Sequence, residues 1–304
     1  MRKKRFKSLS QRQALTGRLF VYPWLIGFLI FFATPFIQSL VFAFSELDLT
    51  PFGLKLTFIG FKNFIKALQE DPTFIQYLTL EVSNTIVNIP LILMFSLFIA
   101  ILLNQKFKGR ALVRAIFFLP VVVMSGALLY VLESYTMEQF YIGAQTGMAM
   151  SNSPFVRGID FRMLLIQITG NIPFVRPLID AINRIYEIIW KSGVQILIFL
   201  AGLQSIPHSL YEVASVEGAT PWESFWKITF PLLSPIILVN VVYTVIDSFT
   251  DYSNDVLRYI LEVAFRRLQH GYSSAIAWIY FLILGIILVL LVIFISKRVF
   301  YMSE

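Results

Sequence analysis

The sequence contains no cysteine and only two histidines, His208 and His270. The absence of cysteine excludes disulfides, thiolate metal sites and a cysteine nucleophile, and it leaves the cellular compartment open. Neither histidine belongs to an H-E-x-x-H pair, so a zinc protease of that type has no support. No G-x-x-x-x-G-K-[ST] segment occurs, which excludes a Walker-type ATP site in this chain.

Charged residues are also scarce: they make up 14% of the 304 residues, whereas 57% are apolar and 16% aromatic. Soluble domains carry about 25% charged residues, so this composition indicates a membrane protein embedded in a lipid bilayer. The net charge of +7 comes from short basic runs between apolar segments, where such runs set membrane orientation. No nucleic-acid partner is therefore expected.

Six apolar segments are long enough to cross a membrane, which takes about 20 residues. The fourth carries Glu187 and Lys191 in its first two turns, so both must lie at an interface or face protein. A further segment, residues 163–175, has only 13 residues and is expected to be interfacial or re-entrant. The predicted spans are residues 19–44, 84–104, 111–132, 185–206, 231–250 and 274–296.

Basic residues predict that both chain termini lie in the cytoplasm. Seven lysines and arginines precede the first span, and the loop QKFKGRALVR is also basic, as the positive-inside rule expects. Residues 256–267 fall outside by this count although they contain three arginines, which we expect three acids to offset, namely Asp251, Asp255 and Glu262. A cleaved signal peptide is the alternative for the first span, but its apolar stretch is about twice the usual length, which favours an uncleaved anchor.

The segment YEVASVEGATPWESFWKITFPLLSP, residues 211–235, interrupts the apolar chain with helix-start and helix-stop signals. Ser209 and Glu212 predict a capping box that begins a short helix. Gly218 predicts its end, because glycine takes the left-handed conformation without strain. Leu210, Val213 and Ala214 give this helix one apolar face.

A second short helix is predicted after it. Thr220 and Glu223 form a second capping box, with Pro221 at the first helical position. The helix is expected to run toward Pro231, with an apolar face of Trp222, Phe225 and Trp226. The product is either a rigid elbow that a partner grips or a passive amphipathic loop in the headgroup layer.

The loop closely resembles the cytoplasmic signature loop of permease subunits in bacterial ABC importers. That pattern reads E-A-A-x-x-D-G-A, then Phe, Ile and two prolines at fixed spacing. Val213 replaces the middle alanine and Glu217 the aspartate, and both keep the type of side chain. The matching residues are Glu212, Ala214, Gly218, Ala219, Phe225, Ile228, Pro231 and Pro235.

Four other segments resemble sugar permeases of the maltose and glycerol-phosphate type, whereas the outward region 133–184 departs from them. They are RLFVYPWLIGFLIFFATPFIQSLVFAFSE, FIGFKNFIKAL with its F-x-G-x-x-N pattern, SNTIVNIPLILMFSLFIAILLN and GRALVRAIFFLPVVV. The resemblance implies an all-α membrane protein with six transmembrane helices, the type I ABC importer transmembrane domain. Its parts would be a basic cytoplasmic N-terminus (1–18), a first span with an outward loop (19–82) and a permease core (83–300) with its coupling loop at 207–231.

The resemblance also implies the partners. A permease of this family works in the bacterial plasma membrane with a second, usually different, permease and an ABC ATPase dimer, which binds ATP and Mg. An extracytoplasmic solute-binding protein delivers a sugar or related solute. The first loop helix would be the coupling helix that fits a cleft in the ATPase, where Glu212 meets a basic residue and Gly218 allows close approach. The chain itself would hold no cofactor or metal and would not be an enzyme.

Polar residues in the spans are candidates for the solute pathway. Asn240, Tyr243, Thr244 and Asp247, followed by Asp251, recur at helical spacing in the fifth span. Amides, a carboxylate and an aromatic ring suit sugar hydroxyls, and an ionisable group in a span is a functional candidate by default. The alternative is that this stripe bonds to a neighbouring helix or subunit. Asn84 and Asn88 form a smaller pair, for which we expect helix packing.

Two other classes remain as alternatives. A secondary transporter driven by an ion gradient predicts internal repeats and several intramembrane ion-coupling residues, whereas no convincing repeat is found. An intramembrane protease predicts G-x-S-G or a G-D dipeptide in a span, and neither occurs.

Overall fold

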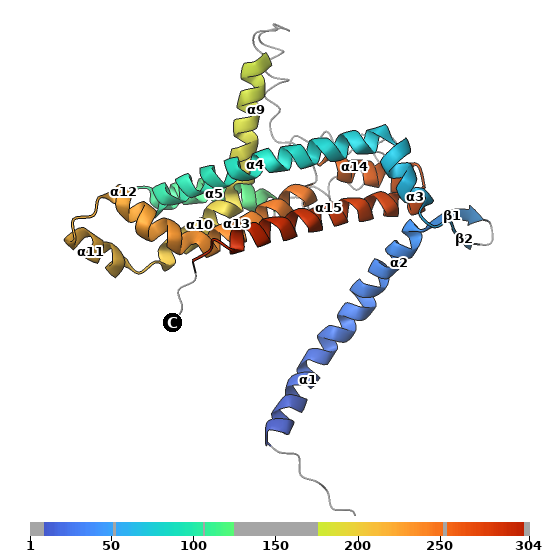
Figure 1. Cartoon of the computed structure of the whole chain (residues 1–304), viewed down its shortest axis with the longest axis horizontal. Helices are drawn as coiled ribbons and strands as arrows, with labels where there is room; N and C mark the ends of the chain where they lie inside the picture. Colours follow the sequence, from blue (N-terminus) through green and yellow to red (C-terminus); the bar gives the residue numbers. More distant parts are fainter. Residues whose placement is uncertain (1–8, 51–52, 106, 125–175, 252–253, 301–304) are drawn as a thin grey trace, which may run out of the picture. The chain divides into compact units, whose positions relative to one another are not determined.

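The computed structural model describes residues 9–50, 53–105, 107–124, 176–251 and 254–300 (Figure 1). Its residues form two compact units. Unit 1 comprises residues 1–72 and 260–279, and unit 2 comprises residues 73–259 and 280–304.

Unit 1 begins with one long apolar helix. It consists of α1 (Leu9–Phe28), a π-helical turn η1 (Leu29–Ala33) and α2 (Thr34–Ala43). The π turn lies just before Pro35, and the Thr34 N–H bonds to the Leu29 carbonyl five residues back. Because proline lacks an N–H and clashes with the preceding turn, this wider turn lets the helix continue through it.

A β-hairpin follows the helix and corrects the all-α prediction. Strands β1 (Ser45–Thr50) and β2 (Gly53–Phe58) pair antiparallel, with Ser45 opposite Phe58 and Leu47 opposite Leu56. The alternating leucines of SELDLT and GLKLTF around the turn sequence TPFG are a strand signal in the sequence. The described part of the chain is therefore mostly helical, with one two-stranded sheet.

The F-x-G-x-x-N segment fixes the end of the first helix. Gly60 has a φ of +61°, which turns the chain into α3 (Lys62–Ile65) and the π turn η2 (Lys66–Glu70). The buried Asn63 amide donates to the carbonyls of Ala43 and Ser45, each at 3.1 Å. It thereby satisfies the Ala43 carbonyl, which the helix end leaves free, and holds the first residue of β1 beside it.

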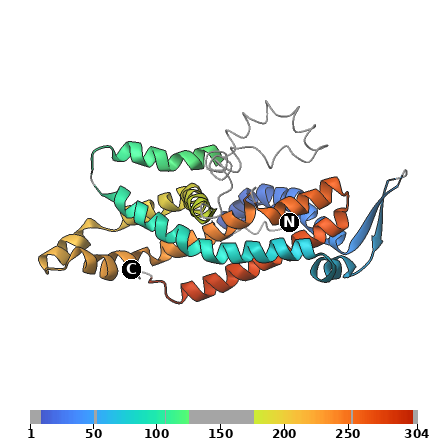
Figure 2. The same ribbon diagram turned by 90° about the horizontal axis from the view of Figure 1, so that it is seen from above.

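Unit 2 is built around a long helix, α4 (Pro72–Asn104), and α5 (Arg110–Met124), α9 (Arg176–Lys191) and α10 (Gly193–Ser205). Helix α10 contacts both α5 and α13 (Phe230–Thr250) (Figures 1 and 2). Gly202 permits the close approach of α13, since a Cβ there would lie 2.9 Å from Ile236. One apolar core cluster around this contact consists of Ala100, Leu103, Ile196, Phe199, Leu200, Leu203 and Leu233.

The remaining elements form the loop and the C-terminal helices. They are α11 (His208–Val216), α12 (Pro221–Ser224), the π turn η3 (Phe225–Thr229), α14 (Asp255–Leu261), the π turn η4 (Glu262–Arg266) and α15 (His270–Ser296). Helix α13 runs between the two ends of unit 2, with α12 at its start and α14 after its end (Figure 1).

The described residues contain four helices that are long and apolar enough to cross a membrane. They are 16–43, 72–104, 221–250 and 270–296, and a fifth span results if the bent pair 184–191 and 193–205 is one segment. Six spans were predicted. The third, 111–132, is described only to Met124, where α5 ends. The short segment 163–175 and most of the region 133–184 lie outside the described residues.

Candidate functional site

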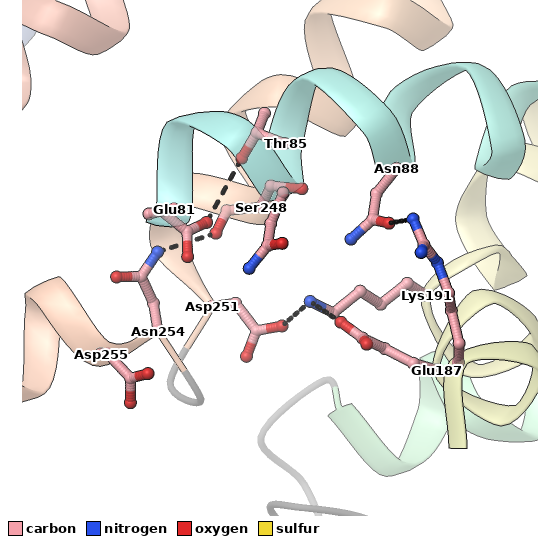
Figure 3. A pocket seen from close by; sticks show the side chains of 11 residues that line it. Glu81, Thr85, Asn88, Glu187, Lys191, Ser248, Asp251, Asn254 and Asp255 are labelled. Carbon is pink, nitrogen blue, oxygen red and sulfur yellow. Dashed lines mark hydrogen bonds and ion pairs between the residues drawn. The ribbon is translucent and has the colours of Figure 1, made fainter. Parts of the chain in front are cut away.

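A polar cavity of about 370 Å³ lies in unit 2 among α4, α9, α13 and the start of α14 (Figure 3). Each of its 11 lining side chains is polar or charged. They are Glu81, Asn84, Thr85, Asn88, Arg184, Glu187, Lys191, Ser248, Asp251, Asn254 and Asp255. The volume lies within the range of about 300–1,000 Å³ for small-molecule sites, but the polar lining differs from their usual apolar one.

One face of α4 forms the first wall of the cavity. Glu81, Asn84, Thr85 and Asn88 recur three and four residues apart, the spacing that brings side chains to one helix face. The Thr85 hydroxyl donates to the Glu81 carboxylate at 3.3 Å. The Asn84 side chain is exposed and makes no hydrogen bond or ion pair with the described residues.

An ion-pair cluster joins α9 to the end of α13. Lys191 Nζ lies 3.0 Å from Glu187 Oε1 and 3.0 Å from Asp251 Oδ2 (Figure 3). The chain bends by 51° immediately after Lys191, between α9 and α10. The Lys191 and Asp251 side chains are 19% and 12% exposed, so this contact is shielded from water far more than a surface pair.

The polar side chains of the cavity differ in how many hydrogen bonds they already make within the protein. Arg184 donates to Asn88 Oδ1 at 3.4 Å. The buried Asn254 is saturated: its amide donates to the Ser248 carbonyl and the Tyr280 hydroxyl, and its oxygen accepts from the N–H groups that begin α14. Asn254 is therefore a helix cap, whereas Asn84 and the amide nitrogen of Asn88 face the cavity with unused capacity.

The polar stripe predicted in the fifth span is divided by the structure. Asn240 and Thr244 are buried against α10. The Asn240 amide donates to the Gln195 carbonyl and the Gln195 amide donates to the Thr244 hydroxyl, both at 3.3 Å. Tyr243 and Asp247 are half-buried and do not line the cavity. Asp251 does line it, through its contact with Lys191.

Sequence reasoning placed the pathway on α13 and expected Asn84 and Asn88 to serve helix packing. Both asparagines line the cavity, and Asn88 also contacts α9 through Arg184, as packing predicts. Sequence reasoning missed Glu81 and Arg184 altogether. The signal for Glu81 was its helical spacing from the two asparagines. Two of the three acids that were expected to offset the outward arginines do pair with arginine. Asp255 pairs with Arg258, and Glu262 pairs with Arg267 at 2.9 Å. Asp251 pairs with Lys191 instead.

The first predicted capping box in the loop is wrong. Helix α11 begins at His208 with Pro207 as its N-cap, and no side chain caps it. Ser209 is therefore already inside the helix, and the Glu212 carboxylate instead contacts His208 Nδ1 at 3.2 Å. The physical reason is Pro207, whose extended ψ of 130° starts the helix two residues earlier than the serine suggests.

The predicted end of this helix is confirmed. Gly218 has a φ of +78°. Its N–H bonds to the Ser215 carbonyl and that of Ala219 to the Ala214 carbonyl, the two bonds of a Schellman motif. Gly218 and Ala219 thus form the turn between α11, which carries Glu212 and Ala214, and the helix that starts at Pro221.

The second capping box is also confirmed, with Thr220 and Glu223 bonded reciprocally. The prediction that a separate short helix follows this box is wrong. Helix α12 continues through η3 into α13 as one helix from Pro221 to Thr250, which carries Phe225, Ile228, Pro231 and Pro235. The π turn again precedes a proline, and the Phe230 N–H bonds to the Phe225 carbonyl, so Pro231 does not break the helix.

Tyr211 ties α11 to this long helix. Its hydroxyl lies 2.8 Å from the Thr229 hydroxyl, one of which donates to the other. The outer face of α11 is left without cover in the described chain: Val216 is 89% exposed and Val213 is also exposed. Two neighbouring exposed valines on a helix that is tied to its successor leave an apolar surface that another protein could cover.

Residues 188–303 match the family described as "Binding-protein-dependent transport system inner membrane component". The probable ABC transporter permease protein YesP of Bacillus subtilis is 32% identical over 297 residues, covering 92% of this chain and 90% of the relative. The multiple sugar-binding transport system permease protein MsmF of Streptococcus mutans is 28% identical over 289 residues, covering 90% and 93%.

A solved structure supports the same fold. It is a crystal structure of a bacterial ABC transporter involved in the import of the acidic polysaccharide alginate, which matches with a TM-score of 0.61 and 22% identity. The match covers 94% of this chain and 96% of that chain. At this identity the likeness concerns the fold.

Proposed function

The chain belongs to the family of inner-membrane permeases of binding-protein-dependent ABC transporters, and from this premise we propose that it passes a sugar or related solute through the polar cavity of unit 2. The family consists of transport components, so this chain is a multi-pass membrane permease and not an enzyme. Membership also decides between the two transport hypotheses in favour of the ABC permease over an ion-driven transporter.

The observation that carries the proposed solute class is the lining of the cavity. Amides and hydroxyls present both donors and acceptors, which a polyhydroxylated molecule needs when it leaves water. Asn84 has free capacity, and the charged side chains Lys191, Glu187 and Asp251 are held by one another. A relative whose name refers to multiple sugars and a fold relative that imports a polysaccharide agree with this class.

We further propose that energy reaches this chain through the loop at 209–235. The ATPase dimer, which binds ATP and Mg, would contact the exposed face of α11, with Glu212 offering a carboxylate to a basic residue. The bond between Tyr211 and Thr229 supports this role, because it links α11 directly to the helix that leads to Asp251. A push on α11 would then reach the cavity through α13.

The remaining proposals concern assembly and orientation. Six spans with both termini in the cytoplasm put the loop inside the cell and the cavity toward the outside, where a solute-binding protein delivers its cargo. The position of α13 supports this arrangement, since the loop precedes the start of this helix and the cavity lies at its other end. A second, different permease chain would complete the pathway.

Co-purification tests this function directly. The chain is purified in mild detergent from its native operon context, as wild type and as Glu212→Ala and Gly218→Trp, and bound proteins are identified by mass spectrometry. We expect an ATPase and a second permease to accompany the wild type, and both variants to lose ATPase while they keep the permease. Variants that retain the ATPase at the wild-type level would exclude the loop as its contact.

A further inference from the structure

Four phenylalanines gather where the first helix of unit 1 ends. Phe44 is the C-cap residue of α2, and its ring lies 5.0 Å from that of Phe64, 5.1 Å from Phe61 and 6.5 Å from Phe58, centroid to centroid. We call Phe44, Phe58, Phe61 and Phe64 the aromatic cap. Such ring pairs stabilise one another beyond the area that they bury, so the four rings hold a common arrangement.

Two rings of the aromatic cap are exposed. Phe58 is 80% and Phe61 67% exposed, whereas Phe44 and Phe64 are half-buried beneath them. Removing such a large apolar side chain from water is favourable. A two-stranded hairpin is also marginal on its own in water. The exposed rings therefore indicate a surface that is covered when the protein is in place.

The register of the hairpin gives the depth of these rings. Phe58 pairs with Ser45, the first residue after the helix end, and Phe61 packs on the C-cap residue Phe44. Both rings thus lie level with the end of the candidate span 16–43. The apolar surface continues down that span through exposed side chains such as Val41 and Ile37.

Charged residues follow farther along the hairpin, before its turn. Asp48 and Lys55 are register partners closer to the turn, and the Lys55 side chain is exposed. Lys62 is exposed beside Phe61. The membrane–water interface favours this distribution, in which aromatic side chains lie at the end of a span and charged side chains lie farther out.

We propose that Phe58 and Phe61 insert into the interfacial zone of the lipid bilayer and anchor the end of the first span at a fixed depth. The occupant of this surface is lipid, because the exposed rings continue the apolar surface of a membrane-spanning helix and lie at its end. The rigid attachment through Asn63 transfers that depth to the helix end.

The absence of cysteine makes the test clean, since each variant carries one reactive thiol. Phe58→Cys, Phe61→Cys and the control Lys55→Cys are made in the full chain, labelled with bimane and reconstituted with the co-purifying subunits in phosphatidylcholine and phosphatidylglycerol vesicles. Fluorescence is quenched either by a lipid with a nitroxide near the glycerol end of its acyl chain or by iodide in the water. A thermal unfolding midpoint equal to that of the wild type shows that each variant is folded.

We expect the lipid nitroxide to quench the labels at positions 58 and 61 several-fold more than the label at 55, and iodide to do the reverse. Equal quenching by iodide at all three positions would overturn the proposal. Protection of positions 58 and 61 from both quenchers would also overturn it, because the surface would then be covered by protein.

Discussion

Lys191, the last residue of α9, and Asp251, which follows the last residue of α13, are joined by a 3.0 Å ion pair although they lie 60 positions apart in the sequence. Glu187 completes the cluster from one turn earlier on α9. The contact fixes the bend between α9 and α10 against the end of the helix that begins in the loop. It is thus placed where a movement of α13 would change the cavity wall.

Removing the lysine is expected to be costly. Lys191→Met leaves two carboxylates of the cluster without their cation, and we expect a loss of roughly 1–3 kcal/mol in the free energy of unfolding. The matched control is Lys227→Met, whose partner Glu223 lies 3.5 Å away on an exposed surface, where an ion pair adds little stability. Thermal unfolding of the purified complex in detergent measures both. Equal shifts would show that the cluster is not structural.

Two glycines of α15 offer a second comparison. A Cβ at Gly271 would lie 2.2 Å from the Ser45 carbonyl oxygen, whereas nothing lies within 4 Å of a Cβ at Gly285. Because a backbone atom cannot move aside cheaply, Gly271→Ala should destabilise unit 1 by about 1–3 kcal/mol or more. Gly285→Ala should leave thermal unfolding unchanged or raise its midpoint slightly. A silent Gly271→Ala would mean that the start of α15 does not pack against the helix–hairpin junction.

The two residues predicted to cap helices in the loop, Ser209 and Thr220, should respond differently to replacement by alanine. Thr220 accepts from the Glu223 N–H, so Thr220→Ala should cost about 0.5–2 kcal/mol locally. Ser209 lies inside α11 and caps nothing, so Ser209→Ala should be nearly neutral. Hydrogen exchange measured by mass spectrometry reports Thr220→Ala through the amides at 222–224 and Ser209→Ala through the amides at 210–212. Faster exchange at 210–212 in Ser209→Ala would restore the capping role of the serine.

Tyr211→Phe separates binding of the ATPase from transmission. The variant removes the hydroxyl that bonds to Thr229 but keeps the ring and the exposed face of α11. We expect normal co-purification of the ATPase together with a lower ratio of solute transported to ATP hydrolysed, measured in proteoliposomes. Thr229→Val should reproduce the effect. A wild-type ratio in both variants would show that force does not pass through this bond.

The sequence predicted local features better than distant contacts. Gly218 and the pair Thr220 and Glu223 were read correctly, because turns and caps depend on a few adjacent residues. The early start of α11 was missed because Pro207 outweighed a serine signal. The continuous helix through Pro231 was missed because a π turn has no simple sequence pattern.

The candidate site was only partly visible in the sequence. Glu187 and Lys191 stood out as charges in an apolar segment, and Asn84 and Asn88 as a polar pair at helical spacing. Their meeting in one cavity depends on how α4, α9 and α13 pack. Periodicity identifies the buried face of a helix but does not name the helix that covers it, so the stripe containing Asn240 and Thr244 gave no sign that α10 would take up its hydrogen bonds.

The most direct test of the solute path compares Asn84→Leu with Thr244→Val in ATP-driven uptake of the solute carried by the binding protein. Asn84→Leu should reduce uptake about two- to tenfold, as expected for a lost hydrogen bond of roughly 0.5–1.5 kcal/mol, with unfolding unchanged. Thr244→Val should lower stability by about 0.6–2 kcal/mol and leave uptake per folded complex unchanged. Normal uptake in Asn84→Leu together with impaired uptake in Thr244→Val would contradict the cavity and return the path to the α13 stripe.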